Sequence, residues 1–279
     1  MVQTVLTIAG SDSGAGAGVQ ADARTIEALG GFAVMAITAI TAQNLHGVRD
    51  WQPVAPRLLA AQLDAVFEDF KVGAVKTGLL PGAAVIRAVR DRLVKRHVSG
   101  AASAPGGRAP PLVVDPVIGS TTGTRFLSAG AIKMLRTELF PLAALVTPNW
   151  PEAALLSGLP VTSVAEAECA GHRLLELGCA AVLVKGGHGP GKQVCDVLVT
   201  ATGGRWLYAS ERVATQNLHG TGCTLSAAVA THLAQGKDLP DAVGAARRYL
   251  VRVLRRNRNL RWGGRGPVGG TRLPFIDAD

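Results

Sequence analysis

The segment Asn217-Leu218-His219-Gly220-Thr221-Gly222-Cys223-Thr224 leads directly into an apolar, alanine-rich run at residues 225–230. Two glycines before a helix-forming run are typical of a tight turn in which the backbone can approach a ligand closely. The N–H groups at the start of such a helix have no partner within it, and the helix dipole favours a negative charge there. The segment therefore predicts a phosphate-binding turn, although the same pattern can be a helix cap without a ligand.

Cys223 falls in or beside the first turn of that predicted helix. A helix N-terminus lowers the pKa of a thiol and makes the sulfur available as a base or nucleophile. A single cysteine is also commonly a small buried hydrophobic residue. The functional interpretation thus predicts a lowered pKa for the Cys223 thiol.

The composition is that of an ordinary globular protein, with 279 residues, 48% hydrophobic and 18% charged residues, and 34 glycines. One large α/β domain accommodates this length. The net charge of +9 comes largely from arginines near the C-terminus, namely Arg247, Arg248, Arg252, Arg255, Arg256, Arg258, Arg261 and Arg265. Few aromatic residues lie among them, which argues against a nucleic-acid stacking surface. We interpret them as a solvated helix face followed by a basic tail, and predict no nucleic-acid partner.

The cysteines, at positions 169, 179, 195 and 223, show no C-x-x-C spacing, which argues against a zinc knuckle or a dithiol motif. The N-terminus lacks the pattern of a signal peptide, and no run of about 18 apolar residues is present. We therefore expect a cytoplasmic protein with reduced thiols and no membrane contact.

Strand-like and helix-like segments alternate along the chain. The predicted strands are residues 2–9, 32–40, 74–78, 112–115, 144–147 and 180–184, with a later, partly antiparallel hairpin at 194–199 and 205–208. Helices are predicted after residue 18, over 56–70, 83–95 and 164–177, after residue 222, and over 241–256. This order, without an internal repeat, predicts an α/β fold with a doubly wound, mainly parallel sheet and helices on both faces. Residues 99–111 are predicted to be a flexible loop, and residues 258–279 a C-terminal tail.

A glycine-rich loop at residues 10–18 follows the first predicted strand. It superficially matches a dinucleotide fingerprint, but the spacing to the third glycine is wrong, and no acidic residue ends the second strand. That strand instead runs into the polar residues 41–44, which suit the recognition of a heterocycle. A nicotinamide enzyme is therefore not favoured.

Two carboxylates follow neighbouring predicted strands. Asp115 ends one strand, and Glu152 follows the next, close to Asn149. Ligands collect at the carboxyl ends of strands in open α/β sheets. These carboxylates could supply the sparse shell that Mg²⁺ prefers when a nucleotide provides the other oxygens. Alternatively, Asp115 caps a turn and Glu152 merely places a charge at a helix N-terminus. Lys185 reaches the same sheet edge, followed by two glycines.

Seven motifs occur in an order that resembles a known family. They are residues 10–22, 38–44, 76–80, 114–117, 147–153, 184–188 and 219–224. Together they resemble the hydroxymethylpyrimidine/phosphomethylpyrimidine kinases of thiamine biosynthesis, in the ribokinase-like superfamily. The resemblance covers nearly the whole chain.

The resemblance implies a ribokinase-like three-layer sandwich, with residues 1–279 forming one kinase domain with a small or absent lid, and a homodimer. It implies ATP-dependent phosphorylation of 4-amino-5-hydroxymethyl-2-methylpyrimidine, and then of its monophosphate, with Mg²⁺ as cofactor. A pyridoxal or pyridoxine kinase of the same fold is the alternative, because that vitamin also presents a hydroxymethyl group on an aromatic nitrogen ring. A ligand-binding regulator that has lost the chemistry is a further alternative.

The resemblance also implies roles for individual residues. The implied catalytic residues are Cys223, Gly220, Gly222 and Lys185, and the implied pyrimidine contacts are Gly10, Asp22, Gln43 and Leu79. The implied nucleotide contacts are Asn149, Lys185, Thr221 and Gly222, and the implied metal ligands are Glu152 and Asp115. The chain departs from relatives at Leu79, where methionine is frequent, and at residues 118–123, which lack a lysine or alanine seen in some of them. The position of Cys223 is an aspartate base in the wider superfamily, so we hypothesise that a neutral thiol permits both phosphorylations.

Overall fold

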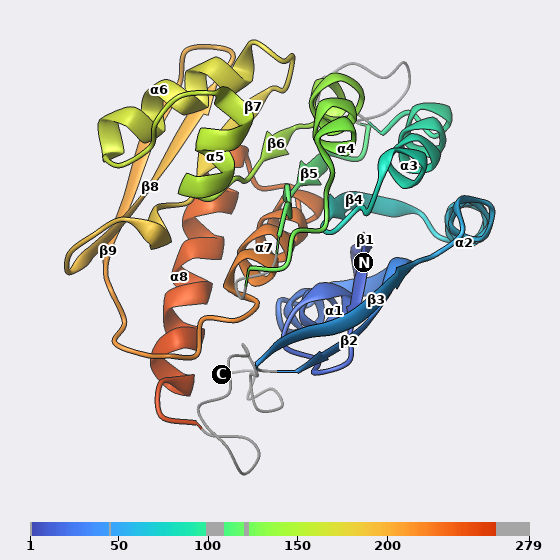
Figure 1. Ribbon diagram of the computed structural model, residues 1–279, viewed down its shortest axis with the longest axis horizontal. Coiled ribbons are helices and arrows are strands. Elements are labelled where there is room, and N and C mark those ends of the chain that lie inside the picture. The colour runs from blue at the N-terminus through green and yellow to red at the C-terminus, as the bar shows by residue number, and fades with distance from the viewer. Residues whose placement is uncertain (1, 45, 99–108, 120–122, 261–279) are drawn as a thin grey trace.

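A computed structural model of the protein describes residues 2–44, 46–98, 109–119 and 123–260. Its centre is a nine-stranded sheet in the order β3-β2-β1-β4-β5-β6-β7-β8-β9 (Figure 1). The strands are β1 (Thr4–Asp12), β2 (Phe32–Asn44), β3 (Gly47–Pro53), β4 (Val72–Thr77), β5 (Leu112–Val114), β6 (Leu145–Val146), β7 (Ala181–Val184), β8 (Gln193–Thr200) and β9 (Arg205–Glu211). Strands β2, β1, β4, β5, β6 and β7 pair in parallel, while β3, β8 and β9 are antiparallel additions. The predicted doubly wound, mainly parallel sheet is confirmed.

Helices cover both faces of the sheet, so the fold has three layers (Figure 1). One face carries α1 (Gly18–Ala28), α7 (Thr221–Ala234) and α8 (Leu239–Asn257). The other carries α2 (Pro56–Asp69), α3 (Ala83–Lys95), α4 (Ala129–Met134), α5 (Trp150–Ser157) and α6 (Val164–Leu175). Short turns of other helix types are η1 (Leu135–Leu139), η2 (Phe140–Leu142) and η3 (Gly186–His188). Alternate residues of the strands contribute to one core or the other, as the period of two requires.

Helix α7 is buried along most of its length, from Thr224 to His232. Its alanines allow close packing against the sheet and against α1 and α8. Its polar side chains bond back to the helix backbone, since Ser226 Oγ donates to the Gly222 carbonyl at 3.0 Å and Thr231 Oγ1 to the Ala227 carbonyl at 2.8 Å. A helix held on all sides provides a rigid support for the turn that precedes it.

The structure differs from the predicted elements at the β1–β2–β3 edge. Strand β1 continues through Gly10 to Asp12, and β2 continues to Asn44, with Asp12 paired to Thr41 beyond a bulge. Strand β3 was not predicted, because its residues are largely exposed and lack an apolar alternation. The extension carries Asp12 and Gln43 out past the end of β4, to the rim of the sheet.

Arg247 is not part of a solvated helix face, contrary to the prediction. Its side chain is buried, its Nε lies 3.1 Å from Asp196 Oδ2, and its Nη2 donates to Ser210 Oγ at 2.9 Å. The prediction was right for other arginines of α8 and its end, since Arg248, Arg252, Arg255, Arg256 and Arg258 are exposed. Arg261, Arg265, most of the predicted tail and residues 99–108 of the predicted loop lie outside the described residues.

Replacing Arg247 with leucine is expected to destabilise the fold by about 3–5 kcal/mol, because the mutation leaves the buried Asp196 carboxylate without its cation. Urea unfolding measures this change. The control is Arg248→Leu, which removes the exposed neighbour on the same helix. Equal stabilities of the two variants would show that the Asp196–Arg247 pair contributes nothing.

No helix in the described parts of the chain combines the length and apolar character needed to cross a bilayer.

Candidate active site

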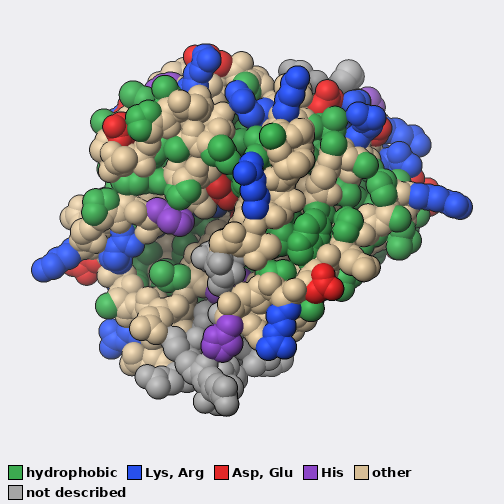
Figure 2. Space-filling model, in the orientation of Figure 1, with side chains coloured by type: hydrophobic (Ala, Val, Ile, Leu, Met, Phe, Trp, Pro, Cys, Tyr) green, Lys and Arg blue, Asp and Glu red, His purple; other side chains and the backbone are tan. Residues whose placement is uncertain are grey.

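A cavity of about 490 Å³ opens at the carboxyl ends of the central strands. The surface is hollowed near the middle of the face shown in Figure 2. All the predicted site residues except Asp22 line this cavity: Gly10, Gln43, Leu79, Asp115, Asn149, Glu152, Lys185, Gly220, Thr221, Gly222 and Cys223. Residues from both ends of the chain thus meet in one space.

The two glycine segments are in direct backbone contact at the cavity wall. Gly220, which precedes α7, has a φ of +80°, and a Cβ added there would lie 1.9 Å from the Gly16 carbonyl oxygen. Gly18 has a φ of +60°, and its Cβ would lie 2.2 Å from the Gly10 carbonyl oxygen. Only glycine fits both the left-handed conformation and the close approach. The N–H groups of the first turn of α7 are therefore held beside the loop at residues 12–18.

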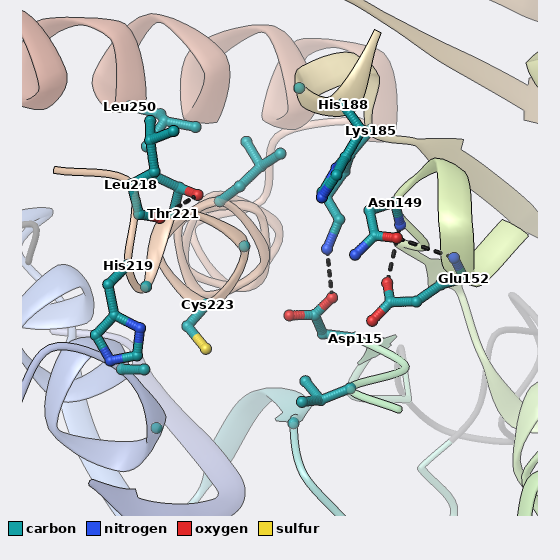
Figure 3. Close-up of a pocket in the computed structure, with 18 of the residues that line it drawn as sticks. Asp115, Asn149, Glu152, Lys185, His188, Leu218, His219, Thr221, Cys223 and Leu250 are labelled. Carbon is teal, nitrogen blue, oxygen red and sulfur yellow. Dashed lines mark hydrogen bonds and ion pairs between the residues drawn. The ribbon is translucent and has the colours of Figure 1, made fainter. Parts of the chain in front are cut away.

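Asp115 and Lys185 form an ion pair next to the start of α7 (Figure 3). Lys185 Nζ lies 2.7 Å from Asp115 Oδ1, which also accepts a hydrogen bond from Thr147 Oγ1 at 3.0 Å. A Cβ added at Gly222 would lie 3.2 Å from Lys185 Nζ and 3.6 Å from Asp115 Oδ2. The ammonium group and the backbone of the turn therefore converge on the same part of the cavity.

Both members of this pair are charged at neutral pH. Burial alone would raise the pKa of Asp115, but the positive charges of Lys185 and Lys76 outweigh it and hold that pKa below its ordinary value. Burial alone would lower the pKa of Lys185, yet the carboxylates of Asp115 and Glu152 raise it. The site thus keeps a cation and an anion out of bulk water.

Asn149 and Glu152 form a capping box at the start of α5. Asn149 Oδ1 accepts from the Glu152 N–H at 2.9 Å, and Glu152 Oε2 accepts from the Asn149 N–H at 2.9 Å. Glu152 therefore does place a charge at a helix N-terminus, as the structural alternative predicted. Both side chains nevertheless line the cavity beside Asp115 and Lys185. Burial and the negative charge of Asp115 raise the pKa of Glu152 to about 7, against the opposing charge of Lys185.

Asp115 and Glu152 do not form a complete metal cage, since the described residues contain no group of three or more His, Cys, Asp or Glu side chains suited to a metal. Mg²⁺ does not need such a cage, because it commonly binds through one or two carboxylates together with waters and substrate phosphates. Asp115 and Glu152 are two hard carboxylates in one cavity beside the turn at residues 220–223, and the charge of Asp115 raises the pKa of Glu152, so they fit that description.

The prediction that the Cys223 thiol has a lowered pKa is wrong. Burial raises the pKa to about 11, and the charges of Asp22 and Asp115 add to this effect, while Lys76 opposes it. The desolvation of a thiolate thus outweighs the helix N-terminus. The sulfur points into the space between His219 and Asp115 (Figure 3), and it is a neutral thiol at pH 7.

Asp22 does not line the cavity. It is fully buried, and its Oδ2 accepts from Thr7 Oγ1 at 2.6 Å and from Lys76 Nζ at 2.7 Å. Its Oδ1 is buried without a hydrogen-bond partner. A Cβ added at Gly78, which does line the cavity, would lie 3.0 Å from Lys76 Nζ. The Asp22–Lys76 pair therefore lies directly beneath the cavity floor.

Three of the lining residues that were not predicted, Asp12, His219 and Arg212, hold segments of the site together. Asp12 and His219 join the N-terminal loop to the turn before α7, with His219 Nε2 2.9 Å from Asp12 Oδ2. Arg212 donates to the carbonyls of Gly187 at 2.8 Å and Gly191 at 3.0 Å, and also to that of Gly189. Asp12 had a detectable signal, because an aspartate within a glycine-rich segment is typical of a turn that its carboxylate stabilises. Nothing local to Arg212 indicates its partners.

Comparisons with known proteins agree with this architecture. Residues 12–269 match the family model described as phosphomethylpyrimidine kinase. The hydroxymethylpyrimidine/phosphomethylpyrimidine kinase of Rhizobium meliloti is 45% identical over 271 residues, which cover 96% of this chain and 97% of that protein. The bifunctional thiamine biosynthesis protein ThiED of Geobacter sulfurreducens is 42% identical, and the match spans 95% of this chain but about half, 51%, of that longer protein.

Solved structures show the same likeness. The phosphomethylpyrimidine kinase of Clostridium difficile superposes with a TM-score of 0.77 at 36% identity, over 90% of this chain and 99% of that one. The pyridoxal kinase of Staphylococcus aureus, in complex with AMP-PCP and pyridoxal, gives a TM-score of 0.83 at 28% identity, over 97% of this chain and 93% of that one. The fold is thus shared by both kinds of kinase, while sequence identity is higher to the pyrimidine kinase.

Proposed function

The chain belongs to the phosphomethylpyrimidine kinase family, and from this premise we propose how its cavity carries out phosphoryl transfer. It is a phosphotransferase, a hydroxymethylpyrimidine/phosphomethylpyrimidine kinase of thiamine biosynthesis, with ATP as phosphoryl donor. The observation that carries the proposal is the convergence of the turn at residues 220–223, Lys185 and Gln43 on one cavity. We assign one kinase domain to the chain.

In the first step, the hydroxymethyl oxygen attacks the γ-phosphorus of ATP, the new O–P bond forms, and the bond to the β-phosphate oxygen breaks to release ADP. The hydroxyl proton leaves to water as the new bond forms. In the second step, a phosphate oxygen of the resulting monoester attacks in the same way. Such transfers pass through a loose transition state, so orientation and charge stabilisation matter more than prior deprotonation of the nucleophile. The main-chain N–H groups of residues 220–223 would hold the equatorial oxygens, and Lys185 would add a positive charge.

The substrate alcohol would lie against Gly10, Gln43 and Leu79, which line the end of the cavity nearest the N-terminal loop. Asp22 does not line the cavity, so its proposed role is indirect. Paired with Lys76 beneath the cavity floor, it would support the wall against which the pyrimidine lies.

The nucleotide would contact Asn149, Lys185, Thr221 and Gly222, at the end of the cavity nearest β7 and α7. Asp115 and Glu152 would hold Mg²⁺, either directly or through water. When bound, Mg²⁺ neutralises phosphate charge and orients the transferred group.

Glu152→Gln is expected to weaken Mg²⁺ binding at least about tenfold, since even outer-shell partners of a metal are worth about 10–100-fold in affinity. The amide of the variant cannot ionise, whereas Glu152 changes charge near its pKa of about 7. The apparent Mg²⁺ affinity of the natural protein should therefore rise more steeply between pH 6 and pH 8 than that of the variant, in which only the terminal phosphate of the nucleotide still ionises. Titration calorimetry with Mg²⁺ and a non-hydrolysable ATP analogue measures both effects.

The same raised pKa affects stability in the absence of ligands. A carboxyl group whose folded pKa exceeds its unfolded value stabilises the fold at low pH, and this contribution is lost as the pH rises through about 7. The melting temperature of the natural protein should therefore fall relative to Glu152→Gln as the pH rises from 4.5 to about 7. If the natural protein and Glu152→Gln show the same pH dependence of both Mg²⁺ affinity and melting temperature, Glu152 is not a metal ligand.

Cys223→Asp is expected to slow the second phosphorylation at least about tenfold more than the first, because a carboxylate would repel a substrate that already carries a phosphate. The negative charges of Asp22 and Asp115, which already act on this position, would intensify the repulsion. Each step is assayed separately, with the alcohol or its monophosphate as substrate. The control is Cys223→Ser, which stays neutral and should affect both steps alike. Equal losses in the aspartate variant would contradict the idea that a neutral group permits both steps.

Mass analysis of the products from hydroxymethylpyrimidine and Mg-ATP tests the function itself. Formation of a monophosphate and then a diphosphate supports the proposal. A higher kcat/KM for pyridoxal would favour the alternative of a vitamin B6 kinase, which the shared fold leaves open. If no ATP is consumed with either substrate, the protein is a binding protein without catalysis.

A homodimer and a cytoplasmic location complete the proposal. Large apolar side chains are exposed on β2 and α2, including Met35, Ile40 and Leu58. A second copy of the chain would cover them. Sedimentation equilibrium of the natural protein and of Ile40→Lys tests the dimer, and a monomeric natural protein would exclude it. Fractionation of cells that express the full chain tests the location.

A further inference from the structure

One ring nitrogen of His219 faces two groups at once. Its Nε2 lies 2.9 Å from Asp12 Oδ2 and 3.1 Å from Nε2 of Gln43. His219 directly precedes Gly220, and it lies on the other side of Cys223 from the Asp115–Lys185 pair in Figure 3. Both His219 and Gln43 line the cavity. A single ring nitrogen either donates or accepts a hydrogen bond. It therefore cannot donate to the Asp12 carboxylate and accept from the NH₂ group of Gln43 at the same time.

Asp12 determines which role the nitrogen takes. Its Oδ1 accepts from the Gly14 N–H at 2.8 Å, and its Oδ2 accepts from the N–H groups of Gly16 at 3.0 Å and Ala17 at 2.9 Å. Burial opposes ionisation, but the hydrogen bond to His219 and the N–H groups of Gly14 and Ala17 hold the pKa of Asp12 below its ordinary value. The carboxylate has no proton to donate, so His219 Nε2 must carry the hydrogen.

Gln43 has only its amide end left to adjust. Its main chain is fixed to the N-terminal loop, because its N–H donates to Ser13 Oγ at 2.8 Å, and Ser13 Oγ in turn donates to its carbonyl at 2.7 Å. The two ends of a glutamine amide have nearly the same shape, and the hydrogen-bond network decides between them. Beside a nitrogen that carries a hydrogen, the amide oxygen is favourable and the NH₂ group is not. The oxygen of Gln43 therefore faces His219.

We propose that His219 is a specificity-determining residue: bound to Asp12, it holds the Gln43 amide with the oxygen toward itself and the NH₂ group toward the cavity. The site then selects a heterocycle with a hydrogen-bond acceptor, such as an unprotonated ring nitrogen, at the edge that meets Gln43. The inference rests on the proposed function. His219 acts through Gln43 and is a positioning residue for it.

This arrangement explains why specificity depends on residues far apart in the sequence. Without the hydrogen on His219, the Gln43 amide could rotate to suit either a donor or an acceptor. When His219 carries that hydrogen, the NH₂ group of Gln43 faces the cavity. An analogue that has C–H in place of the ring nitrogen then leaves this NH₂ group without an acceptor. A lost hydrogen bond of this kind reduces kcat/KM by about 10–100-fold.

The experiment compares the pyrimidine alcohol with two analogues, in each of which one ring nitrogen is replaced by C–H. We expect the natural protein to have a kcat/KM about 10–100-fold lower for one analogue. His219→Leu should shrink this penalty at least fivefold, whereas His219→Gln, whose amide can donate from a similar position, should preserve it. The inference is overturned if neither analogue is penalised, or if His219→Leu lowers kcat/KM for all three compounds by the same factor.

A second measurement does not depend on activity. Long-range ¹H–¹⁵N spectra of the full chain, labelled with ¹⁵N-histidine and assigned with His219→Leu, report which ring nitrogen of His219 carries hydrogen. We expect hydrogen on Nε2, and a neutral ring with hydrogen on Nδ1 alone would overturn the inference. If the natural protein fails to phosphorylate the pyrimidine alcohol, the proposed function fails, and these spectra still decide the role of His219.

Discussion

Gly220→Ala is expected to lower kcat/KM for the pyrimidine alcohol at least about 10³-fold, because the loss of a single oxyanion donor already costs about 10²–10³-fold. The added methyl group would lie 1.9 Å from the Gly16 carbonyl oxygen. It would force the turn before α7 away from the N-terminal loop, and several N–H groups would leave their positions together. Steady-state kinetics of both phosphorylations measure the loss, which should be similar for the two steps because both use the same turn.

Gly236→Ala is the matched control. Gly236 has a φ of +90°, close to that of Gly220, but a Cβ there would meet nothing within 4 Å. This variant carries the left-handed backbone strain of about 1–2 kcal/mol without any collision. It should fold and retain nearly full activity. If Gly220→Ala keeps activity within tenfold of the control, the turn does not contact the transferred phosphoryl group.

Lys185→Met is expected to reduce kcat about 10²–10³-fold for both steps, because it removes a fixed positive charge from a site with little water. Lys185 Nζ lies 2.7 Å from Asp115 Oδ1 and next to Gly222, so its loss also leaves the Asp115 carboxylate short of a partner. The control is Lys192→Met, which removes an exposed lysine close by in the sequence. Rates at saturating substrate, measured with both variants, isolate the effect on kcat.

The pattern of constants distinguishes two roles for Lys185. If only the KM for ATP rises and kcat is unchanged, Lys185 binds the nucleotide equally in the ground state and the transition state. That result would contradict a role in charge stabilisation during transfer. Lys185→Arg retains the charge but not the compact ammonium group, and should recover part of the lost rate.

The layered fold was largely predictable from local patterns. The bounds predicted for α3 match the structure, and those for α2 differ by one residue, because amphipathic periodicity and flanking glycine or proline mark their ends. Strand β3 was missed because an exposed edge strand need not show an apolar alternation. The extension of β1 through Gly10 was also missed, since glycine usually marks a break and only pairing with β2 shows that the strand continues.

The candidate site was predictable where a residue's chemistry follows from its place at a strand end or a helix start. Asp115, Glu152, Lys185 and Gly220 belong to this group, and the structure brings them together. The direction of the Cys223 pKa shift was not predictable, because a helix N-terminus and burial act in opposite directions and only the packing determines which prevails. The burial of Asp22 against Lys76 likewise depends on two strands and a helix that are distant in sequence.

The amino-acid sequence by itself determined the alternation of strands and helices, the glycine turn before a buried helix, and the charged and polar groups available for chemistry, because these depend on neighbouring residues. Only the tertiary structure decided which of those groups touch and which are deprived of water. The physical reason is that desolvation and hydrogen-bond pairing depend on every group packed around an atom. At this site those groups come from segments far apart in the chain. Asp12 and His219, for example, are in contact although 207 residues separate them in the sequence.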